Sequence, residues 1–471
     1  MAPGSTFEAN LPATTLVQKD NTPPTLYQSE EQDALIKKSQ NHLLGFGSAI
    51  HDEIVTGTAG LYFYTASGQR LLDWTSGQMS CLLGHGHPEI VKVIVDHAMY
   101  LDHTFSGMVS PPVIHLAERL CRMLPKGLDR AMFLSTGGES NEAAIKLAKV
   151  CTGKFEVVGL GASWHGVTAQ AVGAQFHFGR SGHGPLMPGS MMLPAPNGYR
   201  SVFRNAADGS YDWEAELDYG WRMIDLQSCG SLACCIVECI QSSGGMHVLP
   251  RGYLKALKRH CEKRGMLLIV DEAQTGVGRC GDFMAIDHEQ VVPDILTLSK
   301  TLGNGLPLSA VVTSEHLHRV SQAKKNNFFF YTTHLNDPLV AAVGDKVLEI
   351  VHRDDLVQHA REVGSVLHRG LRTLMARYGC IGEVRGRGLM AGVEIVTDRE
   401  SKTPGNDLAK RIGDRAFEHG LWANLSSHPS FGGVFRIAPP ITVTAEQIEQ
   451  GLEILERAFA ETEGSLPLYA N

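Results

Sequence analysis

The sequence lacks any long apolar run, and no stretch approaches the roughly 18 consecutive apolar residues of a membrane span. Residues 1–25 are rich in Thr, Pro and Asn and contain no arginine, which fits neither a secretory signal nor an arginine-rich transit peptide. We therefore expect a cytoplasmic protein with no membrane partner, in which residues 1–28 form a flexible tail.

The ten cysteines include no C-x-x-C pair, so zinc-ribbon spacing is absent and buried, reduced thiols are expected. The net charge of −8 argues against nucleic acid as a partner, so an anionic substrate must be held by local groups. With 43% hydrophobic residues, the 471-residue chain has enough apolar material for a sizeable core and room for two or three domains.

Between about residues 85 and 340, helical patterns alternate with short apolar strands at 130–134, 155–160, 233–238, 266–271 and 295–298. This alternation predicts an α/β fold: a large domain with a mostly parallel sheet covered by helices, and ligands at the carboxyl ends of the strands.

After Pro338, two long amphipathic helices are expected at 339–353 and 356–378. Further strands and helices follow, which predicts a smaller α+β domain, completed by N-terminal strands at 60–64 and 70–73. The expected division is a tail (1–28), an N-terminal segment completing the small domain (29–75), a large domain (76–340) and a small C-terminal domain (341–471).

Asp271 ends the apolar run 266–270, and Lys300 follows the next short strand. This arrangement is what pyridoxal 5'-phosphate chemistry requires. The lysine amine forms a Schiff base with the cofactor aldehyde, and the carboxylate keeps the pyridinium nitrogen protonated, so that the ring can accept electrons. Either residue alone would be ordinary surface, but together they indicate a pyridoxal phosphate enzyme.

Three further motifs support this interpretation, and each has a simpler alternative. The glycine-rich segment 135–144 opens a helix whose N-terminus can bind a phosphate, although it could also be a turn with a serine N-cap. Trp164 follows a strand and can stack on a flat ring, or it can be a core residue. Arg436 lies in a short apolar strand and suits a carboxylate ligand, the alternative being a surface ion pair.

Segment 276–281 matches G-x-G-x-x-G, which raises the alternative of a nicotinamide site. That site needs the glycines to open a helix and an acidic residue to follow. Because no helical pattern follows and Asp271 already occupies the strand end, we reject it.

The motifs together resemble those of the class III pyridoxal phosphate aminotransferases, of fold type I, and within that family those of the 2,2-dialkylglycine decarboxylases. The resemblance covers residues 60–458, and it rests on segments 73–80, 83–90, 135–144, 163–166, 242–245, 271–279, 299–303, 330–334 and 435–440.

The resemblance implies a site in which Lys300 joins the cofactor and transfers protons, while Asp271 pairs with the pyridinium nitrogen. It also implies that Trp164 stacks on the cofactor ring and that Gln274 hydrogen-bonds its phenolic oxygen. Gly137 and Gly138 would form the phosphate loop. Thr333 would contact the phosphate of the neighbouring subunit, so at least a homodimer is expected.

For the substrate, the resemblance implies a role for Gln78. It would hydrogen-bond the departing carboxylate and hold the bond from that carboxylate to Cα perpendicular to the cofactor ring. A lone glutamine in a loop is otherwise polar surface. Ser243, Asn424 and Arg436 would bind the substrate. The family also implies a K⁺ or Na⁺ site made of oxygen ligands, here from Thr104, Ser106, Thr333, Leu335 and Asp337.

The expected activity is decarboxylation-dependent transamination. A 2,2-dialkylglycine such as 2-aminoisobutyrate loses CO2 and leaves as a ketone, and a 2-oxo acid such as pyruvate accepts the amine to give L-alanine. An ordinary class III transaminase of an ω-amino acid or amine, which needs no decarboxylation, is the nearest alternative. Biosynthetic use of the same scaffold and a non-catalytic cofactor-binding protein also stay open.

Overall fold

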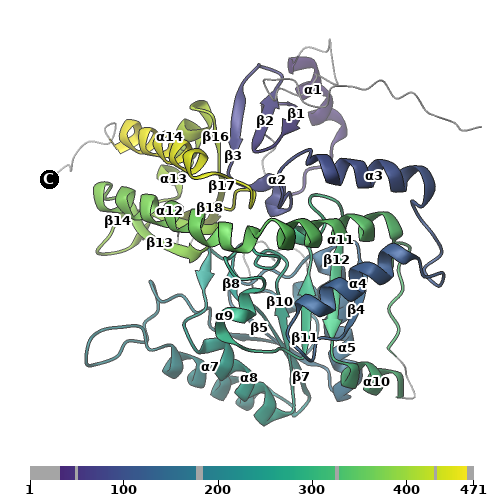
Figure 1. The fold of residues 1–471 in the computed structure, drawn as a ribbon. Helices are drawn as coiled ribbons and strands as arrows, with labels where there is room; N and C mark the ends of the chain where they lie inside the picture. Colours follow the sequence, from purple (N-terminus) through teal and green to yellow (C-terminus); the bar gives the residue numbers. More distant parts are fainter. Residues whose placement is uncertain (1–31, 48–50, 177–183, 324–327, 429–431, 464–471) are drawn as a thin grey trace, which may run out of the picture.

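The large sheet forms the centre of the molecule in the computed structural model, which describes residues 32–47, 51–176, 184–323, 328–428 and 432–463 (Figure 1). Strand β12 runs antiparallel to both neighbours, whereas the other neighbouring strands are parallel. The mostly parallel α/β sheet is thus confirmed. Its seven strands lie in the order β4 (Arg130–Leu134), β12 (Ser309–Thr313), β11 (Ile295–Leu298), β10 (Leu267–Asp271), β7 (Leu232–Glu238), β5 (Glu156–Leu160) and β6 (Ser190–Leu193).

The central strands are buried on both faces, as parallel strands covered by helices usually are. Cys234 and Cys235 are neighbours in β7, and both are fully buried free thiols, as expected. The helices of this part of the chain are α4 (Pro111–Met123), α5 (Gly137–Thr152), α6 (Ala169–Ala174), α7 (Trp213–Gln227), α8 (Tyr253–Arg264), α9 (Ala285–Glu289) and α10 (Glu315–Ala323).

A second sheet forms from the C-terminal part of the chain. Its strands are β13 (Ile381–Arg387), β14 (Met390–Asp398), β18 (Gly432–Ile437) and β17 (Asn424–His428), and β15 (Thr403–Pro404) pairs with β14. The accompanying helices are α12 (Leu356–Arg377), α13 (Asn406–Glu418) and α14 (Ala445–Glu463).

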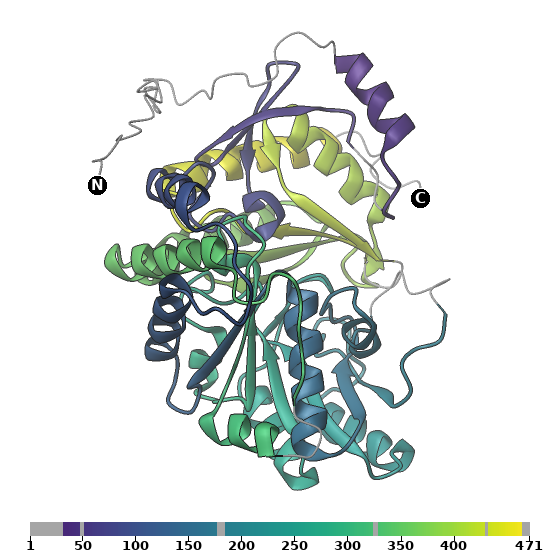
Figure 2. The ribbon, with the colours of Figure 1, turned by 90° about the vertical axis from the view of Figure 1, so that its right-hand side faces the viewer.

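The N-terminal strands join this C-terminal part. Helix α1 (Gln32–His42) precedes β1 (Val55–Ala59), β2 (Tyr62–Thr65) and β3 (Arg70–Asp73), and β3 pairs in parallel with β16 (Leu421–Trp422). Figure 2 shows these N-terminal elements in purple beside the yellow-green C-terminal ones. The domain boundaries themselves stay a prediction, and the expected tail, 1–28, lies outside the described residues.

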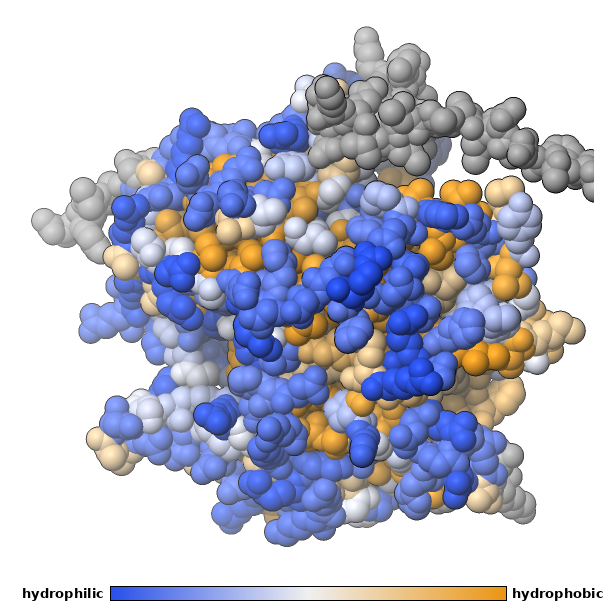
Figure 3. All heavy atoms as spheres, in the orientation of Figure 1, coloured by the Kyte–Doolittle hydropathy of each residue, from blue (hydrophilic) through white to orange (hydrophobic). Residues whose placement is uncertain are grey.

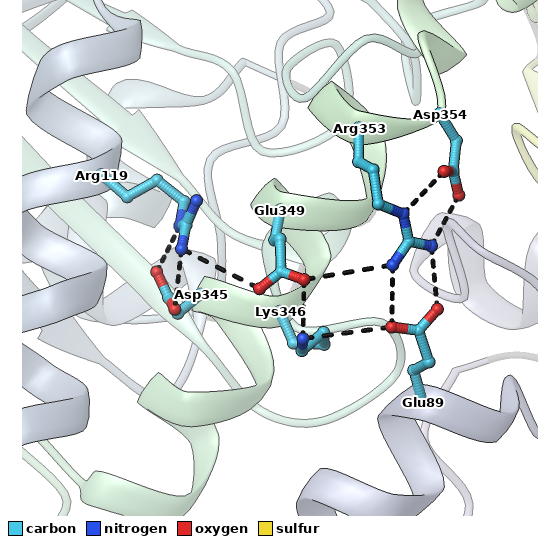
Figure 4. Close-up of polar contacts among 7 residues, drawn as sticks. All are labelled: Glu89, Arg119, Asp345, Lys346, Glu349, Arg353 and Asp354. Atoms are coloured by element: carbon cyan, nitrogen blue, oxygen red, sulfur yellow. Dashed lines mark hydrogen bonds and ion pairs between the residues drawn. The ribbon is translucent and has the colours of Figure 1, made fainter.

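Helix α11 (Pro338–Arg353) packs against α3 (Pro88–Tyr100) and α4. A Cβ atom at Gly344 would come within 2.6 Å of Leu308, so α11 lies very close to the large sheet's connections. Figure 4 shows the ion-pair network along this helix, in which Arg353 contacts Glu89 at 2.8 Å and Arg119 contacts Asp345 at 2.5 Å. Exposed pairs of this kind stabilise a protein little, so apolar packing holds the helices together.

Within the described ranges, no helix is long and apolar enough to cross a bilayer.

Candidate active site

Asp271 and Lys300 meet at the carboxyl edge of the large sheet. Asp271 pairs with Thr297 of the parallel strand β11, and Lys300 begins the short 3-10 helix η1 (Lys300–Leu302) just beyond that strand. Burial lowers the pKa of Lys300, the carboxylates of Asp271 and Glu238 raise it, and the guanidinium of Arg436 lowers it. Four charged groups from distant parts of the sequence therefore act on one another in this region.

The carboxylate of Asp271 is held in one orientation. Its Oδ2 accepts a hydrogen bond from Asn141 Nδ2 at 2.7 Å and lies 2.9 Å from His165 Nδ1, while its Oδ1 accepts from the N–H of Ala273 at 3.0 Å. Asn141 in turn accepts a hydrogen bond from Thr297 Oγ1 at 2.7 Å. Only 4% of Asp271 is exposed, so this network fixes a buried acid at the floor of the site.

The glycine-rich segment forms the N-terminus of α5, which starts at Gly137. Thr136, and not a serine, is the N-cap: its Oγ1 accepts from the N–H of Glu139 at 3.3 Å, and Glu139 Oε2 accepts from the N–H of Thr136 at 3.1 Å. This capping box leaves the N–H groups of Gly137 and Gly138 for an anion.

Close approach of neighbouring atoms explains why Gly137 and Gly166 have no side chain. A Cβ atom at Gly137 would lie 3.3 Å from the side chain of Ser299, and one at Gly166 would lie 2.4 Å from Gly138 Cα. Because Gly166 also has φ +122°, a side chain there would be strained as well as crowded. The turn that follows Trp164 therefore lies directly against the phosphate loop.

Trp164 and Gln274 lie on the same edge of the sheet. The N–H of Trp164 donates to Glu238 Oε1 at 2.9 Å, which fixes the loop after β5. Gln274 is 7% exposed, and its Oε1 has no partner within the described part of the chain. A buried, unpartnered amide end costs about 1–3 kcal/mol, so it indicates a missing polar group. These polar groups, together with the anion-binding N-terminus of α5, fit a pyridoxal phosphate.

Arg436 is a partly buried cation with neutral partners. It lies in β18 and donates to Asn424 Oδ1 at 2.9 and 2.5 Å and to Ser243 Oγ at 3.2 Å. Burial lowers the pKa of Arg436 to about 10. In the described residues the guanidinium contacts only these neutral groups and no carboxylate, so it is left able to bind an anion. The three predicted substrate-binding residues are thus brought together.

Gln78 lies in the irregular turn α2 (Ser76–Met79), where Ser76, Gly77 and Met79 all have positive φ. Strain of this kind persists only where the surroundings enforce it, and it is frequent at functional sites. Asp73 Oδ2 accepts from the N–H of Gly77 at 2.6 Å. The side chain of Gln78 is exposed, so it is accessible to a ligand.

Arg279 connects this turn to the strand of Arg436. Its fully buried guanidinium donates to Ser76 Oγ at 3.1 Å and to the carbonyl oxygens of Ala438 and Pro439 at 3.1 and 2.7 Å. No helix begins at the glycines 276–281, which form turns before α9. Rejection of the nicotinamide site is therefore supported, and this segment instead supplies Arg279.

The expected alkali-cation site stays a prediction, and its one carboxylate, Asp337, has two histidine neighbours. Asp337 Oδ2 lies 2.9 Å from Nδ1 of both His103 and His334, which are nitrogen donors that K⁺ and Na⁺ do not favour. The other expected ligands, the side chains of Ser106 and Thr333 and the backbone carbonyls of Thr104 and Leu335, also stay predictions.

Glu238 gives the site a pH dependence. Burial raises the pKa of its carboxyl group to about 7 from 4.5, with Asp271 adding to the rise. Because the folded protein binds this proton more tightly, the contribution to stability is complete below pH 4.5 and is lost as the pH rises through about 7.

Below pH 4.5, Glu238→Gln should therefore have the same free energy of unfolding as the wild type. Above about pH 7, its free energy of unfolding should be higher by on the order of 3 kcal/mol. Urea unfolding of both proteins across the window tests this, with the exposed Glu446→Gln as control. A difference that stays constant with pH would refute the assignment.

Comparison with known proteins gives a consistent result. Residues 48–459 match the family model described as aminotransferase class-III. An uncharacterised aminotransferase of Schizosaccharomyces pombe is 49% identical over 90% of this chain and 94% of its own. An alanine/serine racemase of Pyrococcus horikoshii is 31% identical over 86% of this chain and 85% of its own. The solved structure of an (S)-enantioselective omega-transaminase from Thermomicrobium roseum superposes with a TM-score of 0.85 at 28% identity, covering 92% of this chain and all of that one.

Proposed function

The chain belongs to the class III aminotransferase family, and we propose that it is a transaminase that uses pyridoxal phosphate to move the amino group of a carboxylate-bearing substrate to a 2-oxo acid. The family and the fold type I architecture are shared with the omega-transaminase neighbour. When bound, the cofactor supplies an electron sink for a bond broken at the substrate Cα.

The observation that carries this proposal is the partly buried guanidinium of Arg436, which acts on the Lys300 amine. Arg436, with Ser243 Oγ, binds the substrate carboxylate, so the substrate amine is directed toward Lys300. The lowered pKa of Lys300 increases the fraction of neutral amine, and Nζ can then take a proton from the substrate Cα. Asp271, fixed by Asn141 and His165, would hold the ring nitrogen of the bound cofactor.

A second candidate, decarboxylation-dependent transamination of a 2,2-dialkylglycine, is favoured by Gln78. This exposed amide lies in a strained turn anchored by Arg279 to the strand of Arg436, and it could bind a departing carboxylate. The reported relatives are transaminases and a racemase, which break a bond to hydrogen, so transamination without CO2 loss has the stronger support.

The experiment that separates the two compares L-alanine and 2-aminoisobutyrate as amine donors to the cofactor-loaded enzyme. Amine transfer and CO2 release are measured in the same reaction. We expect amine transfer from L-alanine without CO2. The decarboxylase would be established instead if 2-aminoisobutyrate, and not L-alanine, released one CO2 per amine transferred. This release should then be lost in Gln78→Ala.

Replacement of Arg436 by alanine should weaken binding of substrates that carry a carboxylate. A hydrogen bond to a charged group contributes about 1.5–3 kcal/mol, so KM for L-alanine should rise roughly 10- to 100-fold. KM for a simple amine without a carboxylate should stay unchanged, because that substrate does not use the guanidinium. The exposed Arg411→Ala serves as control, and an equal loss for both substrates would contradict the assignment.

We also propose that two copies of the chain pair through an apolar patch near Thr333. Six residues of the patch are more than half exposed: Tyr100, Phe105, Met108, Val109, Phe329 and Tyr331. The rings of Phe105 and Tyr331 lie 6.5 Å apart, so the two segments are neighbours. Figure 3 shows apolar surface on the side where Figure 1 places the connection between α3 and α4. A contiguous exposed apolar patch is a common mark of a protein–protein interface.

A further inference from the structure

Two histidines and an aspartate converge at the surface, outside the residues that face Lys300. His103 lies in the connection after α3, and His334 and Asp337 lie in the turn before α11. Each residue offers one ligand atom, and these atoms all lie within 4.8 Å of one another. Both imidazole Nδ1 atoms approach the same carboxylate oxygen, Asp337 Oδ2, at 2.9 Å.

The three side chains of this cluster differ in their exposure to solvent. Asp337 is 8% exposed, whereas both histidine rings reach solvent. The ring centroids lie 4.9 Å apart with a 50° tilt, so the rings are not stacked flat. A buried carboxylate with two accessible imidazoles leaves room for an exogenous group, such as water, on the solvent side.

We propose that His103, His334 and Asp337 bind a borderline divalent cation such as Zn²⁺. Two imidazoles and one carboxylate form a common zinc ligand set, with water in the fourth position. Ligand atoms at about 2.0–2.2 Å from Zn²⁺ are some 3.3–3.5 Å apart in a tetrahedron, so small rotations of the two rings would complete the geometry.

The donor atoms separate this cation from the alkali ions. K⁺ and Na⁺ prefer sets of oxygen ligands, whereas imidazole nitrogen selects zinc and its neighbours in the transition series. The alternative without metal is a pair of Asp–His hydrogen bonds, in which both Nδ1 atoms carry protons. In the metal-bound form each Nδ1 instead donates its lone pair to the cation, so the proton of a neutral ring moves to Nε2 and a charged ring loses one proton.

The bound cation would tie the turn before α11 to the connection after α3. Thr333, in that turn, adjoins His334, and the apolar patch contains Tyr100 at the end of α3 and Phe105 from the connection. The site thus lies beside the proposed pairing surface, but its existence depends neither on the pairing nor on the proposed reaction.

The test uses untagged, cofactor-loaded enzyme, stripped of metal with a chelator and then titrated with Zn²⁺ alone by calorimetry. We expect one Zn²⁺ per chain and a higher thermal unfolding temperature with the metal. His103→Ala, His334→Ala and Asp337→Asn should each weaken binding by more than the roughly 10- to 100-fold lost with an outer-shell partner. The exposed His316→Ala is the matched control and should bind zinc as the wild type does.

Co²⁺ gives a second readout that does not depend on activity. In the wild type it should produce the visible d–d bands of a site with nitrogen and oxygen ligands, and these should vanish in His103→Ala/His334→Ala. The proposal is overturned if the wild type binds no more Zn²⁺ than that double variant. It is also overturned if K⁺ stabilises the protein against heat and Zn²⁺ does not.

Discussion

Lys300→Ala should abolish amine transfer while leaving the fold intact. In the proposed reaction the Lys300 amine both joins the cofactor and moves a proton at Cα, and burial lowers its pKa. Loss of a positioned acid–base group alone costs about 10²–10⁴-fold, and loss of the covalent attachment adds to it. The rate of amine transfer and the visible absorbance of the lysine-bound cofactor should therefore fall together.

Lys149→Ala is the matched control for this experiment. Burial lowers the pKa of Lys149 too, but this residue lies in α5, away from the edge that carries Lys300. It should retain both activity and absorbance. Wild-type protein that takes up no cofactor, or a Lys300→Ala variant that keeps its full rate, would favour the non-catalytic scaffold over the enzyme.

Asp271→Asn should produce the second-largest loss in the rate of amine transfer. Asparagine has the same shape and can still accept from the N–H of Ala273, but it carries no charge to keep a ring nitrogen protonated. Removal of one preorganised electrostatic partner costs about 10²–10³-fold in kcat, and we expect a loss of that order. Cofactor should still bind, because the phosphate loop and Lys300 are unchanged.

The control for this variant is Asp414→Asn, an exposed aspartate on α13 that pairs with Lys410. Comparison of kcat with cofactor occupancy, measured by absorbance, separates weaker chemistry from weaker binding. An Asp271→Asn enzyme with at least half the wild-type kcat would show that this carboxylate does not act on the ring.

The fold and the central pair of residues could be predicted because their signals are local. Short apolar strands alternate with helical patterns, and the carboxyl ends of parallel strands meet at one edge, so Asp271 and Lys300 were expected to lie together. The start of α5 was also readable: Thr136 and Glu139 have the spacing of a capping box, which would have placed the helix start at Gly137.

The partners of these residues could not be predicted, because they come from distant segments. Asn141 lies 130 positions from Asp271, and His165 lies 106 positions from it. Asp337 lies 234 positions from His103. No local pattern links such residues, and only the packing of helices on the sheet brings them together.

The sequence motifs also could not decide which bond at Cα breaks. Lys300 and Asp271 serve transamination, racemisation and decarboxylation alike, because each reaction stores electrons in the same ring. In our proposal the choice depends on whether the substrate carboxylate binds Arg436 or Gln78. The 2,2-dialkylglycine activity therefore stays a prediction, alongside the better supported transamination.

The most direct measurement is to locate the covalent attachment of the cofactor. Enzyme loaded with pyridoxal phosphate is reduced with borohydride and digested, and the labelled peptide is sequenced by mass spectrometry. We predict a single phosphopyridoxyl group on Lys300. A label on a different lysine, or none after full reconstitution, would contradict the account.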